Sequence, residues 1–186
     1  MTALPAGAVQ GVPRPKSWHV ILTRFNVRWD EALDGPSIGT DPAWLENRFK
    51  LFERYCLPSV LGQSRSDFSW LLFFDHQTPE PYAQRARALA DLHPNIHPIF
   101  CRSLPNDFVS ESIVKTIPTE PEWLLTTRLD NDDGLHEDFV ARVQDAQTLE
   151  RSEVLNCPVG IILHGDRAYR LRHTSNAFIS LSEPFA

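Results

Sequence analysis

The chain has 186 residues, of which 42% are hydrophobic, so it is long enough for one sizeable core and short for two. Its net charge of -6 and its scattered lysines and arginines argue against a nucleic-acid partner, because phosphate binding needs clustered positive charge. The three cysteines are widely spaced and match neither a zinc site nor a disulfide framework, and no apolar run reaches the roughly 20 residues of a transmembrane segment.

Residues 1–16 are rich in Ala, Gly and Pro and lack the apolar core of a secretory signal, so we expect a flexible N-terminal tail. Residues 17–186 are expected to form one domain. The missing signal and the unpaired cysteines favour a cytoplasmic location, with peripheral attachment to the inner membrane left open.

Strand-like and helix-like patterns alternate along this domain, which is typical of a largely parallel sheet covered by helices. After a first strand at 18–24, Asp41 and Pro42 predict the cap and first turn of a helix, and Pro58 should kink or restart it. The apolar face of this helix is formed by Leu45, Phe49, Phe52 and Cys56.

The continuous apolar run at 69–74 predicts a strand that is buried on both faces and ends at Asp75. A fourth strand runs directly into an acidic cluster, and a helix should begin near Leu135. The expected strands after the first cover residues 69–74, 96–100, 122–127, 159–163 and 167–172. The expected helices between them cover residues 80–92 and 108–117, and the last two strands form a hairpin around a tight turn at 164–166.

Three carboxylates lie within four residues in the cluster Asp130-Asn131-Asp132-Asp133. Ligands of open α/β sheets bind at the carboxyl ends of strands, and crowded carboxylates have raised pKa values unless a cation compensates them. Mg²⁺ or Mn²⁺ suits this cluster because both ions prefer oxygen ligands and bridge carboxylates to phosphates. The alternative is that these residues cap the next helix, but a cap needs one carboxylate rather than three.

Four strings, LTRFN (22–26), WLLFFD (70–75), TRLDNDD (127–133) and SNAF (175–178), resemble a family of bacterial rhamnosyltransferases of the GT-A type. The resemblance covers about residues 18–183. It implies a GT-A-like, Rossmann-like α/β fold: a mixed, largely parallel sheet flanked by helices, with a C-terminal hairpin. It also implies transfer of a sugar from a nucleotide-diphosphate donor to a glycan, lipid-linked or small-molecule acceptor.

The resemblance assigns donor binding to Thr23, Arg24, Asp75, Arg128 and Asp130. Thr23 and Arg24 would line the nucleotide pocket, and Asp130 would contact the ribose or diphosphate. Asp75 either recognises the base or only forms a turn at the strand end, and Arg128 either pairs with a phosphate or offsets the neighbouring carboxylates.

Asp132, with Asp133, would hold the metal, and Glu183 is the candidate general base because it is the only carboxylate after Asp166. Glu183 could equally be a surface residue. The chain ends three residues later, which leaves open a shortened or non-catalytic, nucleotide-sugar-binding form. A metal-dependent nucleotidyltransferase is a further alternative, although LTRFN lacks the glycines of a phosphate loop.

Overall fold

The computed structural model describes residues 16–28, 38–174, 176 and 178–185. Apart from Lys16, the expected N-terminal tail lies outside the described residues. Ser175 and Ala177, from the last of the four strings, also lie outside them.

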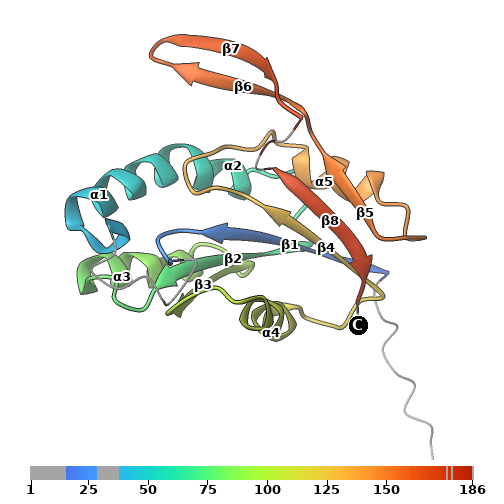
Figure 1. The fold of residues 1–186 in the computed structure, drawn as a ribbon, viewed down its shortest axis with the longest axis horizontal. Coiled ribbons are helices and arrows are strands. Elements are labelled where there is room, and N and C mark those ends of the chain that lie inside the picture. Colours follow the sequence, from blue (N-terminus) through green and yellow to red (C-terminus); the bar gives the residue numbers. More distant parts are fainter. Residues whose placement is uncertain (1–15, 29–37, 175, 177, 186) are drawn as a thin grey trace, which may run out of the picture.

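A six-stranded sheet forms the centre of the fold, in the order β3-β2-β1-β4-β8-β5 (Figure 1). β3, β2, β1 and β4 are parallel, whereas β8 runs antiparallel to β4 and β5 antiparallel to β8. The strands are β1 Ser17–Arg24, β2 Phe68–Asp75, β3 Ile96–Cys101, β4 Trp123–Arg128, β5 Glu153–Asn156 and β8 Ile179–Pro184. This arrangement confirms the expected mixed, largely parallel α/β sheet.

The helices from α1 to α4 form between the strands where the sequence pattern predicts them. Asp41 caps the first helix by accepting a hydrogen bond from Trp44 N at 2.8 Å, with Pro42 in the first turn. A π-helical segment, Phe52–Cys56, then leads into a restarted helix that has Pro58 in its first turn. The α-helices are α1 Pro42–Leu51, α2 Leu57–Leu61, α3 Glu80–Ala88, α4 Asn106–Thr116 and α5 Phe139–Ala146.

Alternate residues of each strand pack on opposite faces of the sheet. One face carries the larger core, where α1, α2 and α3 pack on residues such as Ile21, Trp70 and Phe74. On the other face, Ile113 of α4 packs against Val20 and Phe73. Figure 1 shows α4 on the opposite side of the sheet from α1, α2 and α5. The α4 face is therefore the more thinly covered one.

Two features of the C-terminal half differ from the sequence-based expectation. Strands β5 and β8 were not predicted, and α5 begins at Phe139, four residues after Leu135. The expected hairpin is confirmed as β6 Val159–His164 and β7 Arg167–Arg172, with Gly165 in the left-handed region of its turn (φ 61°). Within the described residues, every helix is too short or too polar to span a membrane.

Candidate functional site at the ends of strands β1 and β4

The carboxyl ends of β1 and β4 lie side by side because the two strands are parallel neighbours, with Leu22 opposite Arg128. Arg24 therefore ends β1 beside the loop that starts after Arg128. Residues 130–133 at its start are called the acidic loop below, and Arg128 Nη2 is 3.4 Å from Asp130 Oδ1. The sheet thus brings two arginines and the first aspartate of the acidic cluster to one edge.

Asn131 fixes the acidic loop to the end of β1. Its side chain is buried and donates a 2.7 Å hydrogen bond to the carbonyl oxygen of Phe25. Its Oδ1 accepts a 3.3 Å hydrogen bond from Arg48 of α1. Because Asn131 faces inward, the flanking Asp130 and Asp132 remain partly accessible at the edge of the sheet.

The aspartates do not cap the next helix. The N-cap position of α5 belongs to Asp138, whose side chain makes no capping hydrogen bond. Asp132 Oδ2 instead accepts a hydrogen bond from Arg48, in an ion pair whose two side chains are about one third exposed. Burial and the nearby carboxylates of Asp132 and Asp130 raise the pKa of Asp133 to about 6, against an opposing effect of Arg48.

Three guanidinium groups surround this loop, from Arg24, Arg48 and Arg128. Burial lowers the pKa of Arg24, and the positive charges of Arg128 and Arg48 lower it further, whereas Asp130 raises it. Mutual repulsion between cations is relieved when an anion binds among them, and arginine is well suited to phosphate oxygens. The edge therefore has the charges needed to hold a diphosphate.

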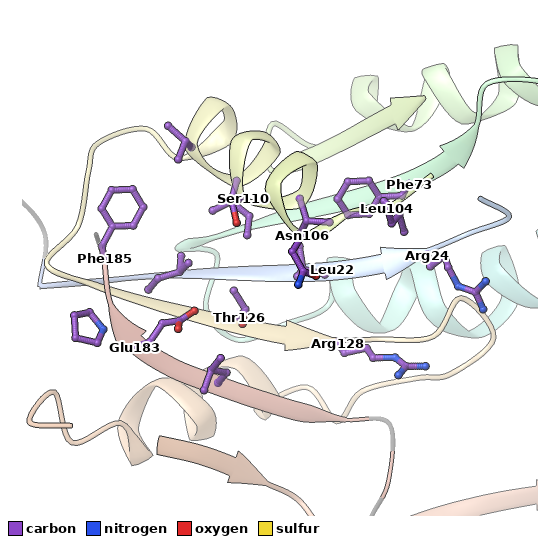
Figure 2. Close-up of a pocket in the computed structure, with 16 residues that line it drawn as sticks. Leu22, Arg24, Phe73, Leu104, Asn106, Ser110, Thr126, Arg128, Glu183 and Phe185 are labelled. Carbon is purple, nitrogen blue, oxygen red and sulfur yellow. The ribbon is translucent and has the colours of Figure 1, made fainter. Parts of the chain in front are cut away.

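A cavity of about 650 Å³ begins beside Arg24 and Arg128 and follows the α4 face of the sheet (Figure 2). Its floor is made by residues of β1, β4 and β8 that point to that face, and α4 forms one wall. The lining residues are Leu22, Arg24, Phe73, Leu104, Asn106, Val109, Ser110, Ile113, Val114, Leu124, Thr126, Arg128, Leu181, Glu183, Pro184 and Phe185. This volume is within the range of small-molecule sites.

The cavity lining includes Arg24, Arg128 and Glu183 from the expected site, but not Asp75, Asp130, Asp132 or Asp133. Asp132 lies on the α1 side, where it meets Arg48. Arg24 and Arg128 therefore stand between the acidic loop and the cavity.

Two of the expected donor-binding residues are buried. Thr23 is fully buried, and its hydroxyl accepts a 2.9 Å hydrogen bond from Trp70 Nε1. Asp75 is 1% exposed, and its carboxylate accepts a 2.8 Å hydrogen bond from Gln77 N in a turn. Both side chains thus lie inside the domain, and Asp75 forms a turn at the strand end, while the expected contacts of Thr23 and Asp75 with a donor stay predictions.

Glu183 is not brought to the aspartates. It lies on β8 opposite Leu124, four residues before Arg128 on β4. At about 3.3 Å per residue, this separation along the strand is about 13 Å. Figure 2 shows Glu183 near Phe185, at the far end of the cavity from Arg24 and Arg128.

Arg48 and Asn26 were missed by the sequence-based interpretation. Asn26, which is buried, donates to Gly39 O and Thr78 Oγ1 and accepts from Asp75 N, so it holds the ends of β1 and β2 together. Asn26 follows the first predicted strand within LTRFN, and this position was the available signal. Arg48 had no comparable signal, because its partner Asp132 is 84 residues away in the sequence.

The acidic loop fits a divalent cation by its chemistry. Asp132 and Asp133 offer only oxygen donors, and a bound cation would favour the charged form of Asp133, whose pKa is raised by burial first and by the neighbouring carboxylates second. One or two carboxylates are sufficient for Mg²⁺ when phosphates and waters complete its coordination. Within the described part of the chain, the group of three His, Cys, Asp or Glu side chains gathered closely enough to hold a metal ion is His136, Glu137 and Asp138, later in the same connection between β4 and α5.

The chain was also compared with known proteins. No curated protein matches it. The model of the family described as "Putative rhamnosyl transferase" matches residues 20–180, which include most of β1, the acidic loop and the start of β8. The chain belongs to this rhamnosyl transferase family.

Proposed function

We propose that this protein transfers a sugar from a nucleotide-diphosphate donor, with rhamnose as the sugar suggested by the family, to an acceptor hydroxyl. The observation that carries the proposal is the convergence of Arg24, Arg48 and Arg128 on the acidic loop, beside a cavity of ligand size. A diphosphate would give these arginines further oxygen acceptors, beside the contacts of Arg48 with Asp132 and of Arg128 with Asp130. A sugar attached to it would lie at the mouth of the cavity.

In this proposal Asp132 and Asp133 hold Mg²⁺ or Mn²⁺, and Arg48 gives up part of its contact with Asp132. A bound divalent ion supplies a Lewis acid for the leaving diphosphate. Arg24 and Arg128 orient the two phosphates and stabilise the charge that grows as the bond to the sugar breaks. Asp130 keeps Arg128 at the edge through their 3.4 Å contact.

The acceptor is assigned to the cavity along α4. The anomeric carbon is bonded to the diphosphate, so the attacked atom must lie close to Arg24 and Arg128. Glu183 is about 13 Å further along the sheet, too far for direct proton transfer at that atom. We therefore assign Glu183 to binding a polar group of the acceptor rather than to the role of base.

The test is a thermal-shift panel of dTDP, UDP and GDP with and without Mn²⁺. A nucleotide at 100 times its Kd stabilises the folded state by about 2.7 kcal/mol, which raises Tm by roughly 5–10 °C for a chain of this size. We expect one nucleotide to give this shift with Mn²⁺ and Asp132→Ala to lose it. Asp91→Ala, which removes an exposed aspartate after α3, should keep it.

Equal shifts in the wild type and in Asp132→Ala would refute the role of the acidic loop. Turnover separates the remaining alternatives. Release of a nucleoside diphosphate from a labelled nucleotide sugar supports transfer or hydrolysis. Release of pyrophosphate from a nucleoside triphosphate and a sugar phosphate would instead assign a nucleotidyltransferase, and binding without either product would assign a non-catalytic binding protein.

A further inference from the structure

The hairpin β6–β7 exposes an unusual amount of apolar surface. Every residue of its two strands is exposed, and in the described structure the strands pair with each other alone. Figure 1 shows the hairpin standing away from the six-stranded sheet. Its exposed large apolar side chains are Val159, Ile161, Ile162, Leu163, Tyr169 and Leu171. Contiguous exposed apolar surface marks an interaction site, and a lone two-stranded hairpin is marginally stable without a partner.

The hairpin is fixed to the domain at its base. His173 N donates a 2.7 Å hydrogen bond to Pro158 O, which closes the open end of the hairpin. The side chain of Asn176 donates to Asn156 Oδ1, Cys157 O and His173 O. These contacts tie the hairpin to the end of β5, so the projecting strands are presented from a held base.

The two faces of the hairpin have different chemistry. Residues directly opposite each other share a face, and the register pairs Ile161 with Arg170 and Ile162 with Tyr169. The first face, called the aliphatic face, carries Val159, Ile161, Leu163, Ala168, Arg170 and Arg172. The second face, called the mixed face, carries Gly160, Ile162, His164, Arg167, Tyr169 and Leu171. Only the aliphatic face combines purely aliphatic residues with long cationic ones.

The charge of the hairpin is opposite to that of the whole chain. It contains three arginines, Arg167, Arg170 and Arg172, and one acidic residue, Asp166, in a chain of net charge -6. An anionic partner would attract the hairpin and repel the acidic remainder. The hairpin would therefore contact the partner surface, and the rest of the domain would be held away from it.

The size of the hairpin favours a lipid surface over a protein partner. Each strand has six residues, whereas a stable protein interface uses roughly 20–30 residues on each side. A six-residue strand is about 20 Å long, too short to cross a hydrocarbon core of about 30 Å. The unpaired strand edges also exclude the hairpin from that core, because their backbone groups would have no hydrogen-bond partners there. The remaining location is the interfacial layer, where water and headgroups can bond to the backbone.

We propose that the β6–β7 hairpin docks on the surface of an anionic lipid bilayer, with its aliphatic face toward the acyl chains. Ile161 and Leu163 enter the boundary between headgroups and acyl chains. Arg170 and Arg172 extend from the same face to lipid phosphates, with their apolar stems along the membrane surface. Tyr169 on the mixed face lies at headgroup level, where its phenol is well accommodated.

The test is co-sedimentation of the nucleotide-free protein with vesicles made of equal parts phosphatidylglycerol and phosphatidylcholine. We expect binding that weakens at high salt and that falls about fivefold with Arg170→Gln and again with Arg172→Gln. Binding to pure phosphatidylcholine vesicles should be much weaker. Because the assay contains no nucleotide, its result is independent of the proposed sugar transfer.

A matched pair of variants tests the orientation. Ile161→Ser removes an aliphatic side chain from the docking face, whereas Ile162→Ser removes the same side chain from the mixed face. Ile161→Ser should lower vesicle binding several times more than Ile162→Ser, and both should leave Tm unchanged because both side chains are exposed. Equal losses, equal binding to neutral vesicles or no binding would overturn the proposal. A dimer in light scattering that Ile161→Ser dissociates would assign the hairpin to a second copy instead.

Discussion

Replacing Asn131 tests whether its side chain holds the acidic loop in place, apart from any role of the neighbouring aspartates in ligand binding. In Asn131→Ala the buried carbonyl oxygen of Phe25 loses its 2.7 Å hydrogen bond, and Arg48 loses an acceptor. An unsatisfied buried polar group costs about 1–3 kcal/mol. We therefore expect the free energy of unfolding to fall by about 2 kcal/mol, and Tm to fall by roughly 4–8 °C for a chain of this size.

The assay is urea denaturation followed by tryptophan fluorescence, with two control variants. Asn131→Asp keeps the side-chain size but places a carboxylate oxygen against the Phe25 carbonyl, so it should destabilise at least as much as Asn131→Ala. Asp132→Ala breaks only a partly exposed ion pair with Arg48, which is worth at most about 1 kcal/mol. If Asn131→Ala cost no more than Asp132→Ala, the hydrogen bond to Phe25 would not be what holds the loop.

Three further predictions depend on which side chains are buried. Burial lowers the pKa of His19 from 6.5 to about 3. Between these two pH values the unfolded chain binds a proton at His19 that the folded chain does not. The free energy of unfolding therefore falls as the pH falls below 6.5. The loss is about 1 kcal/mol between pH 7 and pH 5.5, and urea titrations of His19→Gln should lack this part of the pH dependence. Thr23→Val leaves the buried Trp70 Nε1 without its acceptor and should lower the free energy of unfolding by about 1–3 kcal/mol, whereas Thr23→Ser keeps the hydroxyl and should cost less. Burial raises the thiol pKa of both buried cysteines, so a disulfide reagent should modify the exposed Cys157 first, and Cys157→Ser should remove this fast phase.

The parallel strands of the sheet were predictable because each contains a run rich in apolar residues. The run at 69–74 is the clearest example, since all eight residues of β2 are buried. The cap of α1 was equally local, because Asp41 acts on a backbone group only three residues away. Strand β8 was missed although Ile179 and Leu181 alternate with Ser180 and Ser182, the period expected of a strand.

The candidate site was only partly predictable, because a local sequence pattern does not show contacts between residues that are distant in the sequence. The acidic cluster could be located because three carboxylates lie within four residues directly after one predicted strand. The partner of Asp132 could not, since Arg48 reaches it from a helix that is distant in sequence. The interpretation of Glu183 as a base depended on its position near the end of the chain, and its pairing with Leu124 shows that it lies at the other end of the cavity.

The sequence by itself determined the alternating α/β pattern, the acidic loop at the end of β4 and the two strands of the hairpin, because short-range periodicity and turn residues encode these features. Only the tertiary structure decided that Asn131 turns inward, that Arg24, Arg48 and Arg128 converge on the aspartates, and that the cavity lies on the α4 face. These outcomes depend on strand order and register. Both are set by the burial of whole faces against each other, and no local stretch of sequence contains that information.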